Sequence, residues 1–224
     1  MQIIFFFVLL SCFLSMVVFL EYLQKRNIAK GEITRKMGHF ILGCIFMLLP
    51  LVFQNTLYSI ILCVSISLII YISSRNNKLP CADNVARKTH GTYLYPIGVL
   101  ITLLISSYYN RIDLFYPSII ILMFSDIFAA FIGSYCLKKH FLFYRINSVL
   151  MDRFNKTLYG SCAFFLCTFF ILILFFSLDN ITALFIIALL ITLVEFFSSK
   201  GYDNLTIPIS SIIGLLVFHY NINF

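Results

Sequence analysis

The chain has 224 residues, of which 61% are hydrophobic and only 11% charged, and its formal net charge is +7. A soluble domain has about 25% charged residues, so this chain has too few charges to cover a surface that faces water. These values exclude a soluble globular protein and predict a membrane protein whose backbone groups are satisfied inside helices.

Apolar runs recur along the whole chain, and a spanning helix needs roughly 20 apolar residues. The length therefore leaves room for about eight spans with short connections. In chain order, the predicted spans are Ile3–Leu20, Gly38–Phe53, Leu57–Ser73, Thr92–Tyr108, Leu114–Leu137, Leu158–Leu178, Ile181–Phe197 and Leu205–Tyr220. No linker or convincing internal repeat separates them, so we expect an all-α polytopic membrane protein that forms one domain over residues 1–224.

The basic residues indicate the orientation in the membrane. Of the 16 Lys and Arg residues, all except Arg111 fall in the connections after the first, third, fifth and seventh predicted spans. Basic connections stay in the cytoplasm, so both termini are expected outside. We expect a multi-pass protein of the bacterial cytoplasmic membrane whose polar chemistry faces the cytoplasm. A simpler explanation of these basic residues than a site for a phosphorylated substrate is that they attract anionic lipid headgroups.

Two basic clusters stand at predicted span entrances in the first half of the chain. Arg35, Lys36 and His39 enter the second span in GEITRKMGHF, and Arg87 and Lys88 precede the fourth in ARKTHGTYLYPIG. The Gly and Pro that follow Lys88 suggest irregular backbone, which at membrane depth lines a cavity or is buried in protein. The alternative for His39 is a histidine at the membrane interface whose hydrogen bonds are made without a functional role. The alternative for the segment after Lys88 is an ordinary turn at the interface.

Asp126 lies in the middle of an apolar run. A charged side chain at the bilayer centre costs about 2.5–3.5 kcal/mol on insertion scales, so we expect Asp126 to face protein or a wet cavity. Ala129, Ala130 and Gly133 share its helix face, and small residues of this kind mark close helix packing. A protonated carboxyl group that bonds a neighbouring helix is the alternative.

Two further polar clusters lie near the sixth and seventh predicted spans. Lys156 and Thr157 introduce the sixth, where a helix N-terminus offers free N–H groups and a positive dipole end to a phosphate. Glu195 lies in the last turn of the seventh, where the macrodipole disfavours its charge unless a cation or lysine compensates it. Asp203 and Asn204 follow closely, and carboxylate and amide oxygens can converge on Mg²⁺, which commonly brings substrate phosphates. Groups of both charges therefore share one membrane face, as phosphoryl transfer requires.

The ordered motifs RKMGH, HGTYLYPIG, SDIFAAFIG, KTLYGS and VEFFSSKGYDNLTIP resemble the CTP-dependent polyprenol-type lipid kinases over nearly the whole chain. That family includes phytol kinase, dolichol kinase and a related diacylglycerol kinase, and it belongs to a wider group with phosphatidate cytidylyltransferase. The resemblance implies a multi-pass enzyme that transfers the γ-phosphate of CTP to a lipid alcohol with Mg²⁺. Two positions depart from the family pattern: Ser125 replaces the usual Gly, and Tyr159 replaces the usual Glu.

The expected site combines the clusters with the resemblance. The expected catalytic residues are Asp126, Lys156 and His39. The expected metal ligands are Asp126, Glu195 and Asp203. The expected nucleotide- or phosphate-binding residues are Arg35, Lys36, Arg87, Lys88, Thr157 and Asn204. The expected partners are CTP or another nucleotide, a lipid alcohol and membrane lipids, with a homodimer as a further arrangement and no nucleic acid, because the short loops carry no recognition fold.

Three alternative functions are kept beside the kinase. One is cytidylyl transfer to a phospholipid, although the long signature of the cytidylyltransferases is not visible. Another is an ion-coupled secondary transporter that uses Asp126 and Glu195, although transporters tend to show repeated halves. The last is a membrane scaffold without catalysis, in view of Tyr159. The motifs do not name the acceptor alcohol, because the cavity that selects it depends on packing.

Overall fold

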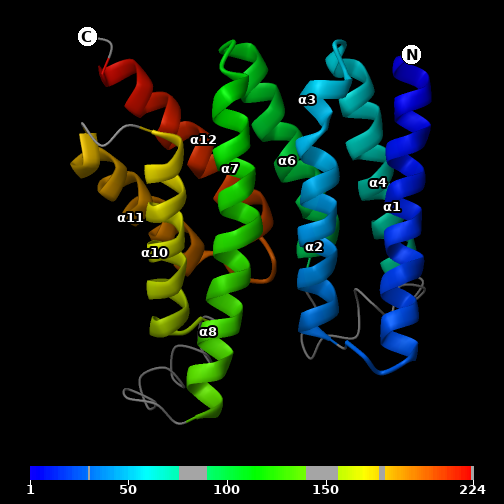
Figure 1. Cartoon of the computed structure of the whole chain (residues 1–224), viewed down its shortest axis with the longest axis horizontal. Helices are drawn as coiled ribbons and strands as arrows, with labels where there is room; N and C mark the ends of the chain where they lie inside the picture. The colour runs from blue at the N-terminus through cyan, green and yellow to red at the C-terminus, as the bar shows by residue number, and fades with distance from the viewer. Residues whose placement is uncertain (30, 76–89, 140–155, 177–179, 223–224) are drawn as a thin grey trace. The chain divides into compact units, whose positions relative to one another are not determined.

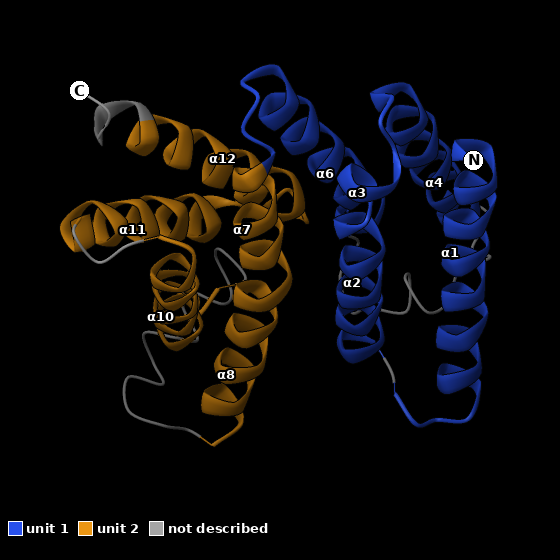
Figure 2. Cartoon of the chain, turned by 45° about the horizontal axis from the view of Figure 1, so that its top comes forward, with its two compact units in different colours: residues 1–112 blue, residues 113–224 orange. Residues whose placement is uncertain are grey.

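The computed structural model of the chain is built from helices (Figure 1). It describes residues 1–29, 31–75, 90–139, 156–176 and 180–222, and none of these residues lies in a strand. The all-α prediction is therefore confirmed over the described residues. The helices form two compact units, residues 1–112 and 113–224 (Figure 2). That the whole chain acts as one domain stays a prediction.

The first unit contains α1 (Gln2–Lys25), α2 (Glu32–Met47), the short α3 (Leu49–Val52), α4 (Thr56–Arg75) and α6 (Gly91–Tyr108). Helix α1 packs against α2 and α4, and α4 packs along α6. The largest fully buried side chains of this unit are apolar or aromatic: Phe13, Phe46, Leu49, Leu62, Ile66 and Tyr95.

A 3₁₀ turn, η1 (Ile112–Leu114), lies where the first unit ends and the second starts. The second unit begins with one continuous helical run made of α7 (Phe115–Ile120), a single π-helical turn η2 (Ile121–Ser125) and α8 (Asp126–Lys138). The unit continues with α10 (Leu158–Phe175), α11 (Ile181–Phe197) and α12 (Asp203–Ile222). Helix α10 packs against α8 and α11, and α12 packs against α11, α7 and η2. Figures 1 and 2 both show α11 and α12 running obliquely to α8.

Length and surface composition make the fold compatible with a multi-pass membrane protein. Among the described residues, 6 helical runs are long and apolar enough to cross a membrane, while α11 and α12 are shorter apolar helices. Large apolar side chains stay exposed along the runs, such as Phe7 and Val18 on α1 and Phe170 and Leu174 on α10. Apolar surface of this extent suits lipid rather than water. Eight spans with both termini outside stay a prediction.

Small residues let α8 and α10 approach each other closely. A Cβ atom placed on Gly160 would lie 2.9 Å from the backbone oxygen of Ala129, and one placed on Gly133 would lie 2.5 Å from Oγ1 of Thr157. Real Cβ atoms essentially never lie this close to a neighbour, so a side chain at either position would force the facing atoms to shift. The small-residue face predicted around Asp126 is therefore the face of α8 that packs on α10.

We expect Gly160→Ala to destabilise the protein, because the added methyl group meets the backbone of α8, which cannot move aside as a flexible side chain can. Overpacking of this kind costs typically about 1–3 kcal/mol. Thermal unfolding in detergent, followed by circular dichroism, should show a lower midpoint. The control is Gly214→Ala on α12, whose Cβ atom would meet only the side chain of Ile187, with Cγ2 at 3.3 Å. Equal midpoints for the two variants would contradict the close contact.

Candidate functional site

Lys156 lies at the centre of a polar cluster in the second unit. Its Nζ donates a hydrogen bond to Oε1 of Glu195 and lies 3.5 Å from Oδ2 of Asp203. The Glu195 side chain is only 2% exposed and that of Lys156 13%. Asp126 acts electrostatically on both Lys156 and Glu195. Side chains from α8, α11, α12 and the segment before α10 therefore meet around one ammonium group.

Thr157 positions Lys156 by capping α10. Its backbone is extended, with φ −125° and ψ 149°, and its Oγ1 accepts a hydrogen bond from the backbone N–H of Gly160 at 3.0 Å. An N-cap of this kind satisfies one of the free N–H groups of the first helical turn. The structure thus gives the Thr157 hydroxyl a partner within the chain, and its predicted role in phosphate binding stays a prediction.

The turn between α11 and α12 places the end of one helix beside the start of the next. Lys200 and Gly201 have positive φ values of 54° and 89°, a region that glycine adopts without strain. The hydroxyl oxygens of Ser198 and Thr206 lie 2.6 Å apart and tie the end of α11 to the first turns of α12. This turn brings the residues on either side of it, including Glu195 and Asp203, within reach of the same lysine.

The two carboxylates next to Lys156 differ in their bonding. Oδ1 of Asp203 accepts the backbone N–H of the buried Asn204 at 3.0 Å, while Oδ2 faces Lys156. Oε2 of Glu195 is buried and accepts no hydrogen bond from any described residue. A buried polar atom left without a partner costs about 1–3 kcal/mol. It is therefore the atom of the cluster best suited to bind an added cation or hydroxyl group.

The carboxylates also set the charge state of Lys156. Burial alone would lower the pKa of Lys156, but the neighbouring carboxylates of Glu195, Asp203 and Asp126 outweigh burial and raise the pKa above its usual value. Lys156 is therefore protonated at neutral pH. With all three carboxylates ionised, these four groups carry two net negative charges. The other lysines described in this unit are exposed, namely Lys138, Lys139 and Lys200.

A single π-helical turn precedes Asp126, the first residue of α8. The turn η2 ends at Ser125, whose Oγ accepts a hydrogen bond of 3.0 Å from Oγ1 of Thr168 on α10. Both hydroxyl groups are fully buried, and Asp126 is 6% exposed. Single π-helical turns inside α-helices are frequent at functional sites. Asp126 thus faces protein rather than lipid, as predicted.

The predicted metal ligands Asp126, Glu195 and Asp203 fall in this cluster, with Lys156 against two of them. Within the described part of the chain, no group of three or more His, Cys, Asp or Glu side chains is arranged to hold a metal ion. In this arrangement, an ammonium group stands where the two carboxylates meet. A Mg²⁺ site would need their oxygens to turn from the lysine to the ion, and it stays a prediction.

The first unit holds three further predicted residues, Arg35, Lys36 and His39, all of them buried on α2. The Arg35 guanidinium pairs with both carboxylate oxygens of Glu32: Nη2 contacts Oε1, and Nε donates to Oε2 at 3.3 Å. The His39 ring stacks on the Tyr95 ring, with centroids 4.9 Å apart and an interplanar angle of 23°. The roles predicted for these residues toward a nucleotide stay predictions.

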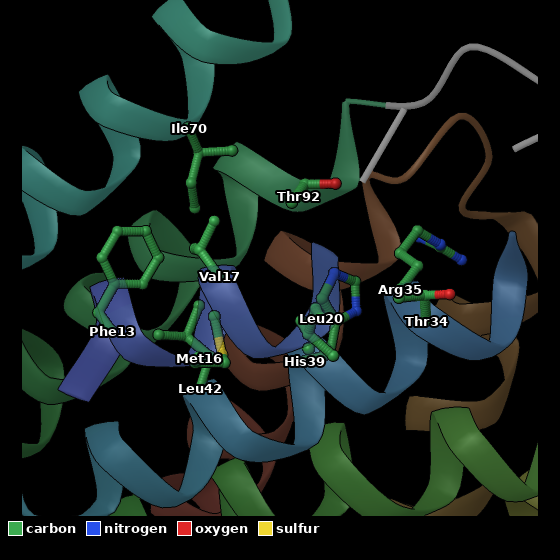
Figure 3. Close-up of a pocket in the computed structure, with 11 residues that line it drawn as sticks. Phe13, Met16, Val17, Leu20, Thr34, Arg35, His39, Leu42, Ile70 and Thr92 are labelled. Carbon is green, nitrogen blue, oxygen red and sulfur yellow. The ribbon is translucent and has the colours of Figure 1, made fainter. Parts of the chain in front are cut away.

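A pocket opens beside Arg35 and His39 in the first unit (Figure 3). Four helices line it, with α1 and α2 contributing most of the residues. The lining residues are Phe13, Met16, Val17, Leu20, Thr34, Arg35, Gly38, His39, Leu42, Ile70 and Thr92. Figure 3 shows Thr34 and Arg35 together at one end, away from Phe13 and Met16. The surface that these residues expose to the pocket is almost entirely apolar.

The sequence analysis missed several residues that shape these sites. Ser198 and Thr206 join α11 to α12, and they flank a turn marked by Gly201. Glu32 precedes Arg35 by three residues, a spacing that pairs charges on a helix surface and that could have predicted the contact. Nothing in the sequence marked Thr34 as a residue that lines a pocket.

No protein-family model, curated protein or solved structure matches this chain. The resemblance to the CTP-dependent lipid kinases therefore stays an inference from sequence motifs. The resemblance assigns roles to Asp126 on α8, Glu195 on α11 and Asp203 on α12, and all three belong to the cluster around Lys156. Arg87 and Lys88 lie outside the described residues.

We expect Lys156→Met to destabilise the protein strongly, because it removes the ammonium group bonded to the buried carboxylate of Glu195. Loss of one partner of a buried ion pair costs about 3–5 kcal/mol. Adding Glu195→Gln to Lys156→Met should recover much of the stability, because a neutral amide needs no counter-charge. Thermal midpoints in detergent measure both effects.

Lys200→Met is the control for this prediction, because Lys200 is exposed in the turn between α11 and α12. A Lys156→Met protein as stable as the Lys200→Met protein would contradict the buried pair.

The pH dependence of the stability follows from the raised pKa of Lys156. Its stabilising contribution is complete below the usual lysine pKa and is lost as the pH rises through the higher value of the folded state.

Proposed function

We propose that this chain is an integral-membrane lipid kinase that transfers the γ-phosphate of a nucleotide, CTP by the motif resemblance, to a long-chain lipid alcohol. The observation that carries the proposal is the buried meeting of Asp126, Glu195 and Asp203 with Lys156. Catalysis of phosphoryl transfer consists mainly of positioning and of neutralising charge. A buried cluster with both signs of charge, in a chain compatible with a membrane protein, supports that chemistry.

We place the reaction at the cytoplasmic face of a bacterial cytoplasmic membrane, with eight spans and both termini outside. The sidedness of the basic residues supports this topology. Lys156, at the centre of the cluster, and Lys200, in the turn between α11 and α12, both belong to connections predicted to be cytoplasmic. A water-soluble nucleotide would then reach the cluster from the side where it is made.

In the proposed reaction, each residue of the cluster has a role suited to its position. Asp126, buried at the start of α8, accepts the proton of the lipid hydroxyl group. Lys156 neutralises charge on the phosphate. Oε2 of Glu195 and the carboxylate of Asp203 are the oxygens suited to hold Mg²⁺, which supplies further charge neutralisation when bound. Asn204 offers an amide group to the nucleotide at the same helix start.

The decisive assay supplies γ-labelled CTP or ATP, with phytol, a polyprenol or diacylglycerol, to the purified full-length protein in detergent. We expect label in a lipid product, and we expect Asp126→Asn to reduce its formation by about 100-fold or more, the size of a general-base contribution. Asp113→Asn is the control, because Asp113 is an exposed acid of the same unit. No label in any lipid, with folded protein, would reject the kinase.

The same preparations distinguish the alternative functions. Release of pyrophosphate and transfer of label from α-labelled CTP to a phospholipid would indicate cytidylyl transfer instead. Uptake of a solute by protein-containing liposomes, without any labelled lipid, would indicate a transporter. Unchanged cellular function of Asp126→Ala, together with an inactive purified protein, would indicate a scaffold.

We also expect divalent cations to be required. EDTA should abolish lipid labelling, and added Mg²⁺ should restore it. Glu195→Gln should weaken Mn²⁺ binding at least about 10-fold, which corresponds to roughly 1.4 kcal/mol, because it removes a carboxylate oxygen from the cluster. Electron paramagnetic resonance of free Mn²⁺ measures this binding without any turnover. Unchanged Mn²⁺ affinity, with Asp113→Asn as control, would rule out Glu195 as a ligand.

A further inference from the structure

We propose that Lys156 keeps divalent cations out of the carboxylate cluster until a ligand that carries a phosphate group draws the lysine away. Binding of the cation and binding of the phosphate are then cooperative, because each removes an obstacle to the other. Lys156 thus has two successive sets of partners, carboxylates in the ligand-free protein and phosphate oxygens in the loaded protein. The proposal rests on the proposed function, since it concerns the regulation of the same site.

The ammonium group of Lys156 occupies the position that a shared cation would need. Its Nζ bonds Oε1 of Glu195 and lies 3.5 Å from Oδ2 of Asp203, so one oxygen of each carboxylate faces it. A Mg²⁺ ion held by both carboxylates needs oxygen contacts of about 2.0–2.1 Å. It cannot make them while the ammonium group contacts the same two oxygens. The lysine and the ion therefore exclude each other from this position.

The charge of the cluster nevertheless suits a divalent ion. With all groups ionised, three carboxylates and one ammonium group leave two net negative charges, which one divalent cation balances. Oε2 of Glu195 is buried and accepts no hydrogen bond from any described residue. A buried oxygen without a partner is unfavourable, and coordination of a cation would remove that cost. The ligand-free cluster therefore has both the charge and an unused oxygen for a divalent ion.

Lys156 also lies on the way from water to Glu195. The side chain of Glu195 is 2% exposed, whereas those of Lys156 and Asp203 are 13% and 14% exposed. An ion that arrives from water meets the lysine and Asp203 before it reaches Glu195. Like charges repel strongly where water is largely excluded. The ammonium group therefore opposes the entry of the ion as well as its coordination.

A phosphate group is a ligand that can move Lys156. Lysine binds phosphate as a compact point charge on a flexible stem. Lys156 precedes the N-cap residue Thr157 and lies outside α10, so its side chain can turn without breaking the hydrogen bonds of the helix. Once the ammonium group bonds phosphate oxygens, Oε1 of Glu195 and Oδ2 of Asp203 become free to bind the ion.

The first test measures the affinity of the purified full-length protein for Mn²⁺ by electron paramagnetic resonance of the free ion, without CTP or a lipid alcohol. Inorganic phosphate should raise the affinity of the wild-type protein at least about 5-fold, the lower end of the usual range for coupled sites. Matched solutions without protein account for the Mn²⁺ that phosphate itself binds. An affinity that phosphate leaves unchanged would overturn the proposal.

Lys156→Gln removes the charge of Lys156 but keeps a hydrogen-bond donor for Glu195. Without phosphate, this variant should bind Mn²⁺ at least about 5-fold more tightly than the wild-type protein, because the competing ammonium group is gone. Phosphate should then add little. An affinity no higher than that of the wild-type protein, or an undiminished effect of phosphate, would contradict the exchange.

Lys200→Met is the matched control, because Lys200 is an exposed lysine in the turn between α11 and α12. It should keep the wild-type affinity for Mn²⁺ and the full effect of phosphate. An equal gain in Mn²⁺ affinity for Lys156→Gln and Lys200→Met would indicate a general effect of net charge and would contradict a specific role of Lys156.

The wild-type protein offers a second readout, which does not depend on the folding of a variant. Acetylation by sulfo-N-hydroxysuccinimidyl acetate, located by mass spectrometry of peptides, reports whether the amine of Lys156 is engaged. Mn²⁺ alone, at a concentration that fills the site, should raise the acetylation rate of Lys156 several-fold relative to Lys200, and added phosphate should lower it again. An unchanged or lower rate with Mn²⁺ would show that the ion binds without displacing the lysine.

The outcomes separate this proposal from the proposed kinase. Cooperative binding of Mn²⁺ and phosphate by a protein that labels no lipid would support the exchange at Lys156 and reject the kinase. Labelled lipid from a protein whose Mn²⁺ affinity does not respond to phosphate would support the kinase and reject the exchange.

Discussion

The buried contact between Lys156 and Glu195 is the interaction on which the polar site of the second unit depends. A carboxylate in the last turn of α11 is disfavoured by the helix dipole, and burial to 2% exposure adds a desolvation cost. The lysine before α10 offsets both effects, and it also approaches Asp203 at the start of α12. One ammonium group thus joins the ends of three helices. A buried ion pair of this kind is weak support for stability by itself, but the loss of one partner leaves an uncompensated buried charge.

Close packing makes this contact geometrically feasible. Gly133 and Gly160 have no Cβ atoms, so α8 and α10 can approach each other closely. Gly160 on α10 lies against the backbone of Ala129, and Gly133 on α8 lies against the side chain of Thr157. The start of α10 is thereby held against α8, and Lys156 comes within electrostatic range of Asp126. The π-helical turn before Asp126 and the bonded hydroxyl groups of Ser125 and Thr168 lie along the same helix pair. The small residues therefore contribute to the site indirectly, because they allow the short distance between α8 and α10.

The two units carry different chemistry. The second gathers acids around a lysine, which suits phosphates and cations. In the first, Arg35 is already paired with Glu32 beside an apolar pocket. The sequence motifs had grouped Arg35 with the phosphate-binding residues because of its charge. The ion pair with Glu32 shows that the charge of such a residue can be offset within its own helix, one turn away.

The sequence by itself determined the helical segments, because lipid requires long apolar runs whose backbone groups bond within the helix. It also identified Asp126, Lys156, Glu195 and Asp203, since ionisable groups in such runs are costly and therefore conspicuous. Only the tertiary structure decided that Lys156 bonds a carboxylate 39 residues away, that Thr157 caps its own helix, and that Thr34 lines a pocket. Composition and periodicity are local properties, whereas the partner of a side chain depends on how neighbouring helices are rotated and at what depth they meet.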